Sequence, residues 1–105
     1  MVLFRRLLGE VLRSARMQRG MTLRDLSAEA RVSLGYISEI ERGQKEASSE
    51  LLASLCTALE VPLSDVLREV SDAVAVEEAA VAAVAATPII VSSRRRGGEV
   101  VASAA

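Results

Sequence analysis

The sequence predicts an all-α domain of five helices, followed by a C-terminal extension that is either helical or disordered. Half of the 105 residues are apolar, but only 2% are aromatic. Ala, Val and Leu must therefore build the core, and these side chains suit packed helices. Apolar residues also recur at spacings of three and four in successive segments, with glycine, proline or capping residues between them. A chain of this length supports one compact domain, which we place at residues 4–74.

The first helix is expected from Phe4 to Arg19. Its apolar residues recur at helical spacing, and Gly20 then offers a left-handed position at which a helix can end. Thr22 and Asp25 stand three residues apart, as in a capping box. They predict the start of a second helix of about two turns.

A third helix is predicted from Leu34 to Arg42, after a tight connection at residues 31–33. Only Ile37 and Ile40 form its inner face. The remaining side chains of this helix have no burial partner within the motif. We therefore expect an outward face that is free to contact a partner.

Two further apolar stripes predict the fourth and fifth helices, with a break at Pro62 and a capping residue at Ser64. The fifth helix carries more apolar residues than a four-helix core can cover, which predicts a homodimer interface on its stripe. The stripe of the fourth helix consists of Leu52, Leu55, Cys56 and Leu59. The predicted interface consists of Leu63, Val66, Leu67, Val70 and Val74.

Charge is divided unevenly along the chain. Residues 1–47 hold nine Lys or Arg against six Asp or Glu, whereas residues 48–93 hold only Arg68 against seven acids. The overall net charge of −1 argues against binding to nucleic acid through bulk charge alone. The division instead predicts one surface that faces a polyanion and another that does not.

The residue types that are missing exclude most enzyme classes. The chain has no histidine and a single cysteine, Cys56, so disulfides, ordinary zinc sites and histidine-activated nucleophiles are excluded. Ser27 lies near Asp25 in the sequence, but nothing would activate its hydroxyl. We expect a protein that is not an enzyme and binds no cofactor or metal. No run of about 18 apolar residues predicts a membrane span or signal peptide, so a cytoplasmic location is expected.

The stretch from Thr22 to Leu67, which includes RVSLGYISEIERGQKEASSELL, closely resembles the Xre/Cro family of helix-turn-helix regulators. The likeness extends over roughly residues 8–70 and implies a lambda-repressor-like fold. Within the family, this segment is most similar to actinobacterial regulators that activate Clp protease and chaperone genes. The resemblance implies a transcription factor that binds a palindromic operator in double-stranded DNA as a homodimer, with RNA polymerase as a further partner.

The resemblance also assigns roles on the predicted third helix, which reads the major groove in this family. Well-known phage repressors have glutamines where Leu34 and Gly35 stand here. Leucine can contact a thymine methyl and Glu39 can accept from cytosine N4, so we expect less direct readout and more reliance on DNA shape. The base-contacting residues carried over are Leu34, Gly35, Ser38 and Glu39, with Tyr36 beside them.

Other positions in the family contact phosphate or hold the fold. The resemblance implies a salt bridge between Arg16 and Glu41. Arg31 stands where many relatives have glycine, so a differently wound turn is expected there. Arg13 and Arg19 are interpreted as ordinary surface charges. The expected phosphate contacts are Thr22, Arg24, Arg42, Gln44 and Lys45.

Residues 75–105 form an Ala/Val-rich extension and tail without a core, serving dimerisation, degradation or both. The tail ends in small apolar residues after a basic triplet, so it is either a frayed terminus or a degradation tag for a Clp protease. Two alternatives to the transcription factor remain. One is an antitoxin-type interaction protein that autoregulates its own promoter, and the other is a structural helix pair that binds no DNA.

Overall fold

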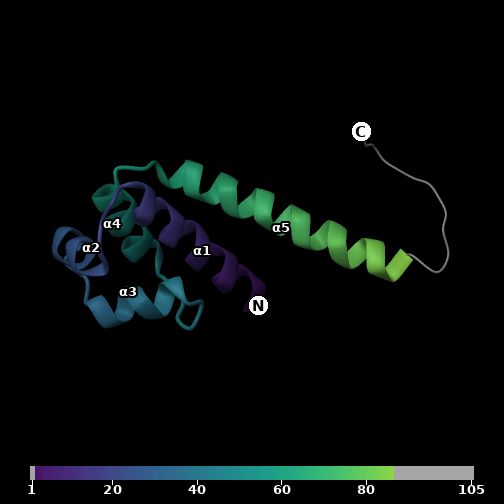
Figure 1. The fold of residues 1–105 in the computed structure, drawn as a ribbon, viewed down its shortest axis with the longest axis horizontal. Coiled ribbons are helices and arrows are strands. Elements are labelled where there is room, and N and C mark those ends of the chain that lie inside the picture. Colours follow the sequence, from purple (N-terminus) through teal and green to yellow (C-terminus); the bar gives the residue numbers. More distant parts are fainter. Residues whose placement is uncertain (1, 87–105) are drawn as a thin grey trace. The chain divides into compact units, whose positions relative to one another are not determined.

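The computed structural model describes residues 2–86, and these residues form five helices and no strand (Figure 1). The predicted all-α fold is confirmed. Of the described residues, 2–75 belong to one compact unit and 76–86 to a second, and the predicted degradation tag lies outside the described residues. The helices are α1 (Val2–Gln18), α2 (Leu23–Ala30), α3 (Leu34–Glu41), α4 (Ser49–Leu59) and α5 (Leu63–Ala86).

Side-chain caps set the beginnings of α2, α3 and α4. The Thr22 hydroxyl accepts from the Asp25 amide, and the Thr22 amide donates to the Asp25 carboxylate, both at 3.0 Å. The second of these bonds is the main reason that the pKa of Asp25 lies below its usual value. The hydroxyls of Ser33 and Ser48 cap α3 and α4 by accepting from the amide three residues later, without a reciprocal bond. The predicted capping residue Ser64 instead lies inside α5, which begins at Leu63.

All five helices contribute to one hydrophobic core. Cys56 belongs to it, and burial raises the pKa of its thiol, so this cysteine is a packing residue with little thiolate character. The most deeply buried side chains are Leu12, Leu26, Ile37, Ile40, Leu55, Leu59 and Val66.

The predicted interface stripe on α5 is divided between the core and the surface. Val66 and Val70 are only 1% and 2% exposed, so they are core residues of the protomer itself, and the expectation that they are exposed was wrong. They stand one helical turn apart and face the other helices together. Leu67 lies next to them around the helix and is 43% exposed. Leu63 and Val74 are half-buried at the edge of the core.

The connection between α2 and α3 keeps a left-handed residue although no glycine is present. Arg31 adopts φ 59° and ψ 45°, so the expectation of a differently wound turn was wrong. The Ser27 hydroxyl donates to the Val32 carbonyl at 2.6 Å, and the Val32 amide donates to the Ser27 carbonyl at 3.2 Å. These two bonds offset the steric cost of the left-handed arginine, which is of the order of 1 kcal/mol.

Helices α1 and α3 approach each other closely at Gly9. A Cβ atom at this buried glycine would stand 2.6 Å from the Glu41 carbonyl oxygen and would also meet the Ile40 carbonyl oxygen. Only a residue without a side chain fits there. Gly9 therefore sets the distance between α1 and the end of α3.

Among residues 2–86, no helix is both long enough and apolar enough to cross a membrane.

Candidate nucleic-acid interface

Helix α3 buries one side and exposes the other. Ile37 and Ile40 are each 1% exposed, whereas Leu34 is 38% exposed and Tyr36 is 36% exposed. Gly35 is also exposed, and Ser38 and Glu39 are half-buried. The inner face of this helix is the predicted one. On the outer face Leu34, Gly35 and Tyr36 are exposed, whereas Ser38 and Glu39 are partly covered.

Gly35 has no steric reason to be a glycine within the protomer. A Cβ atom added there would meet nothing within 4 Å, and the residue does not have a positive φ. Glycine in a helix costs about 0.5–1 kcal/mol relative to alanine. The missing side chain at Gly35 therefore has no role inside the protomer, but it lets a partner approach the backbone of α3 closely.

We predict that Gly35→Ala raises the free energy of unfolding by up to about 1 kcal/mol and weakens binding to operator DNA. The added methyl group stabilises the helix but stands on the outer face, where DNA is expected to approach. Urea denaturation and a DNA titration on the same preparation measure both effects. An alanine variant that binds DNA as tightly as the natural chain would contradict a close approach at Gly35.

Tyr36 joins α3 to the loop that follows it. Its hydroxyl donates to the Glu46 carbonyl at 3.0 Å, ten residues further along the chain. The loop between Arg42 and Ser48 carries Lys45, one of the expected phosphate contacts. Tyr36 therefore positions this loop, in addition to any contact that it makes with a base.

The end of α3 holds a hydrogen-bonded group of three predicted DNA contacts. The Arg42 guanidinium donates to the Ser38 hydroxyl and, at 3.3 Å, to the Gln44 side-chain oxygen. Both acceptors are neutral, so the positive charge of Arg42 is not cancelled by them. Arg42 thus lies at the end of α3 with its charge available to a phosphate.

The expected contacts at the start of α2 are placed differently from one another. The Thr22 amide donates to the Asp25 carboxylate, and the Thr22 hydroxyl oxygen accepts from the Asp25 amide. The hydroxyl hydrogen is therefore the donor that Thr22 keeps for a phosphate. Arg24 is exposed on the first turn of α2, and Lys45 is exposed in the loop after α3. The two cations come from either end of the helix-turn-helix.

The pair expected from the sequence, Arg16 and Glu41, forms a bidentate ion pair. Arg16 Nε lies 2.8 Å from Glu41 Oε2, and Nη2 lies 3.1 Å from Oε1. The two side chains are only 12% and 6% exposed. A further bond at 2.8 Å joins Arg16 Nη1 to the Met21 carbonyl. The hydrogen bond with Glu41 raises the pKa of Arg16 above its usual value. This group fixes the end of α3 to α1 and to the start of the α2 region.

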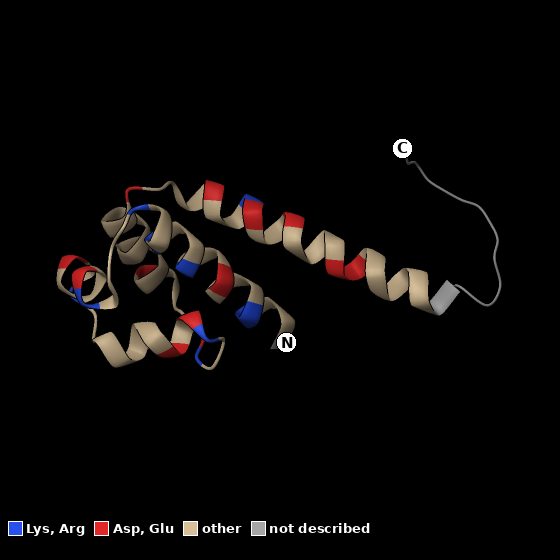
Figure 2. Ribbon diagram, in the orientation of Figure 1, with Lys and Arg blue, Asp and Glu red and all other residues tan. Residues whose placement is uncertain are grey.

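The basic and acidic halves of the sequence lie on different helices (Figure 2). Basic residues stand on α1 and around the loop after α3, whereas the described part of α5 carries five acids and a single base, Arg68. The polyanion-facing surface is therefore expected on α1 to α3.

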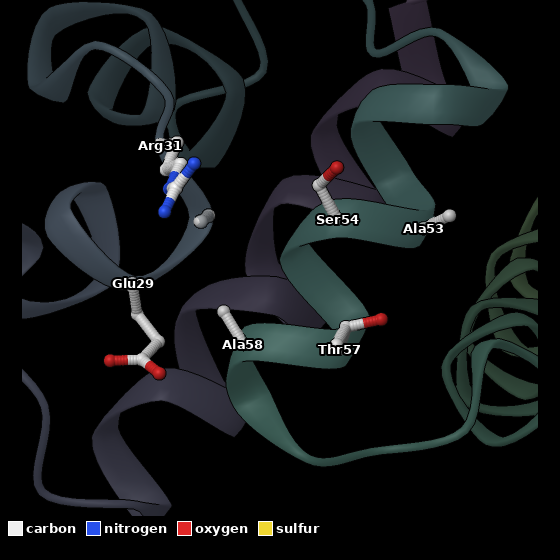
Figure 3. A pocket seen from close by; sticks show the side chains of 7 residues that line it. Glu29, Arg31, Ala53, Ser54, Thr57 and Ala58 are labelled. Carbon is white, nitrogen blue, oxygen red and sulfur yellow. The ribbon is translucent and has the colours of Figure 1, made fainter.

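One hollow of about 330 Å³ lies between the end of α2 and α4 (Figure 3). Glu29 and Arg31 stand across it from Ser54 and Ala58. It holds one acid and one base, so it has no preference for an anion. Residues 2–86 contain no group of histidine, cysteine, aspartate and glutamate side chains that could hold a metal ion. This hollow therefore offers neither a metal site nor an activated nucleophile.

A family model for helix-turn-helix domains, HTH_3, matches residues 12–66. The chain belongs to this helix-turn-helix family. It is 59% identical to the transcriptional regulator ClgR of Mycobacterium tuberculosis over 76 residues, which are 72% of this chain and 68% of that protein. This helix-turn-helix protein is accordingly a DNA-binding transcriptional regulator and not an enzyme.

Solved structures agree with the helix-turn-helix assignment. The clp gene regulator ClgR from Corynebacterium glutamicum is 53% identical with a TM-score of 0.69, over 72% of this chain and 81% of that chain. The restriction-modification controller protein C.Esp1396I, solved as a tetramer with its 35 base-pair operator, is 25% identical with a TM-score of 0.58. That comparison covers 64% of this chain and 93% of the controller chain.

One structural residue of this helix-turn-helix domain, Gly9, and one structural contact, made by Tyr36, were not predicted from the sequence. Gly9 could have been found, because a glycine on the apolar side of an amphipathic helix usually has a packing reason. The bond from Tyr36 to the Glu46 carbonyl had no signal in the sequence, since a backbone acceptor can be supplied by any residue type.

Proposed function

We propose that this helix-turn-helix regulator activates Clp protease and chaperone genes by binding a palindromic operator as a homodimer. The observation that carries the proposal is that α3 exposes Leu34, Gly35 and Tyr36 on its outer face. The buried pair of Arg16 and Glu41 fixes that helix in place. The similarity to a solved clp gene regulator supports the choice of target genes.

In this proposal α3 lies in the major groove, which is about 12 Å wide. Leu34 contacts a thymine methyl group, and Glu39 accepts a hydrogen bond from cytosine N4. Arg24, Arg42 and Lys45 contact backbone phosphates on either side and set the orientation of the helix. Few bidentate base contacts are available, so DNA shape supplies part of the specificity.

The roles of base and phosphate contacts are separated by comparing Lys45→Ala with Glu39→Ala. We expect Lys45→Ala to weaken operator and random duplex DNA about equally, with a shallower dependence on salt. Glu39→Ala is expected to change the preferred sequence, because its carboxylate reads a base. Selection of bound duplexes from a random library, followed by titration, measures both. A Lys45→Ala protein with altered specificity and normal binding to random DNA would contradict these roles.

The homodimer interface is proposed on the part of α5 that the core leaves exposed. Leu67 is its most exposed large residue within the compact unit, at 43%, and Leu63 and Val74 are half-buried beside the core. A dimer is proposed because one recognition helix contacts too few bases, and a two-fold operator matches a two-fold protein.

Leu67→Asp is expected to give a folded monomer, because it places a charge in the interface without entering the core. Sedimentation velocity measures the mass, and circular dichroism checks the helices. Arg68→Asp, at the next and more exposed position, is the control and is expected to remain dimeric. An intact Leu67→Asp dimer would move the interface to another surface. Val70→Asp, by contrast, is expected to unfold the protomer, because Val70 is buried.

Two further partners follow from the proposed role. An activator contacts RNA polymerase at its promoter, and a Clp protease is proposed to bind the tail, which lies outside the described residues. Pull-down of each from cell extract with the full chain tests both proposals.

A further inference from the structure

A basic hollow lies beside the recognition helix, between α1 and α3. Its volume is about 540 Å³, and Ser38 of α3 forms part of its wall. The charged residues that line it are four arginines, Arg6, Arg13, Arg16 and Arg42, and two glutamates, Glu10 and Glu41.

Most of these charges are already paired with one another. Arg6 lies 3.1 Å from Glu10, and Arg16 lies 2.8 Å from Glu41, so both glutamates are neutralised within the hollow. Arg42 is bonded to neutral acceptors. Arg13 is exposed on α1 and forms no ion pair with any residue between 2 and 86. The hollow therefore keeps two uncompensated positive charges, on Arg13 and Arg42.

The position of the hollow indicates which anion these charges attract. Ser38 of the recognition helix and Arg42, which caps the C-terminal end of that helix, both line the wall of the hollow. When α3 lies in a major groove, the phosphates that border the groove pass beside that helix. Guanidinium groups match phosphate oxygens in charge and in geometry. A backbone phosphate is therefore the anion expected to reach this hollow when α3 lies on DNA.

We infer that Arg13, together with Arg42, holds a DNA backbone phosphate in this hollow, so that α1 forms part of the DNA-binding surface. The inference rests on the proposed function and extends it to a helix outside the helix-turn-helix motif. Arg13 could not be selected from the sequence, because helical spacing does not reveal which polar side of α1 borders α3.

Arg13→Gln is compared with Arg19→Gln, which removes the same charge just beyond the end of α1. Arg19 is bonded to Glu60 and does not line the hollow. The equilibrium constants for an operator duplex and a random duplex are measured over about a fivefold range of salt. Arg13→Gln is expected to reduce the slope of log K against log salt by about 0.9, which corresponds to one phosphate contact. It should weaken both duplexes about equally.

Arg19→Gln is expected to leave the slope unchanged, and Arg13→Lys is expected to retain most of it, because the positive charge remains. Inorganic phosphate at the same ionic strength should compete no better with the natural chain than chloride, since the hollow is completed by a phosphate fixed on DNA. Circular dichroism melting verifies that Arg13→Gln is folded.

Three results would overturn the inference. The first is an unchanged slope of log K against log salt in Arg13→Gln. The second is an equal loss of DNA affinity in both glutamine variants, which indicates an effect of bulk charge. The third is strong competition by inorganic phosphate, which indicates a site for the free anion. A natural chain that binds no duplex at any salt concentration would overturn the proposed function as well, so the two failures are distinguishable.

Discussion

Replacing Arg16 with alanine is expected to lower the free energy of unfolding by about 3 kcal/mol. The substitution leaves the Glu41 carboxylate, 6% exposed, without its bidentate partner, and it also removes the donor to the Met21 carbonyl. An unpaired buried charge costs far more than the pair itself contributes, because the desolvation of the remaining ion is no longer offset. Urea denaturation followed by circular dichroism measures the loss.

Arg19→Ala is the matched control for this prediction. Arg19 pairs with Glu60 at 2.9 Å, a distance similar to that in the buried pair, but these side chains are 41% and 69% exposed. An exposed pair contributes only about 0–1 kcal/mol. Similar costs for the two alanine variants would show that burial of Arg16 and Glu41 adds nothing to the interaction.

The double variant Arg16→Met with Glu41→Leu separates the cost of an unpaired charge from the value of the pair. Replacing both partners with apolar residues of similar size removes the buried ion altogether, so most of the stability is expected to return. DNA binding should recover less completely, because the guanidinium fork also sets the orientation of α3. A double variant as unstable as Arg16→Ala would contradict this division.

The sequence predicted the helices well because each is an amphipathic segment, although the capping residue predicted for α5, Ser64, lies inside that helix. Thr22, Ser33 and Ser48 all cap helices by accepting from an amide three residues later, a local interaction that does not depend on the rest of the fold. Local signals of this kind can be read from the sequence without knowledge of tertiary structure.

The predictions that were wrong had different causes. Ser64 was a local error, because α5 begins one residue earlier, at Leu63. The stripe on α5 could be recognised as apolar, but only the positions of the other helices decide that Val66 and Val70 are covered while Leu67 is not. The turn at Arg31 keeps its left-handed residue because Ser27 and Val32 form bonds across it. Candidate contacts on α3 were selected by resemblance, whereas the hollow that contains Arg13 appears only when α1 is placed beside α3.

The second large effect is expected from Gly9→Ala, which should lower the free energy of unfolding by about 2 kcal/mol. The new methyl group would stand 2.6 Å from the Glu41 carbonyl oxygen, and backbone atoms cannot rotate away as a flexible side chain does. Overpacking of this kind costs up to about 3 kcal/mol, of which about 1 kcal/mol is offset by the better helix propensity of alanine.

Gly35→Ala is the control for Gly9→Ala, since the same substitution in another helix meets nothing within 4 Å. We expect the two variants to shift stability in opposite directions, by a total of about 3 kcal/mol. Both should lose affinity for operator DNA, but for different reasons. Gly35→Ala obstructs the approach of DNA to an intact fold, whereas Gly9→Ala pushes the end of α3 away from α1 and disturbs the Arg16–Glu41 pair. A Gly9→Ala protein as stable as the natural chain would show that α1 and α3 can separate freely, and Gly9 would then not set their distance.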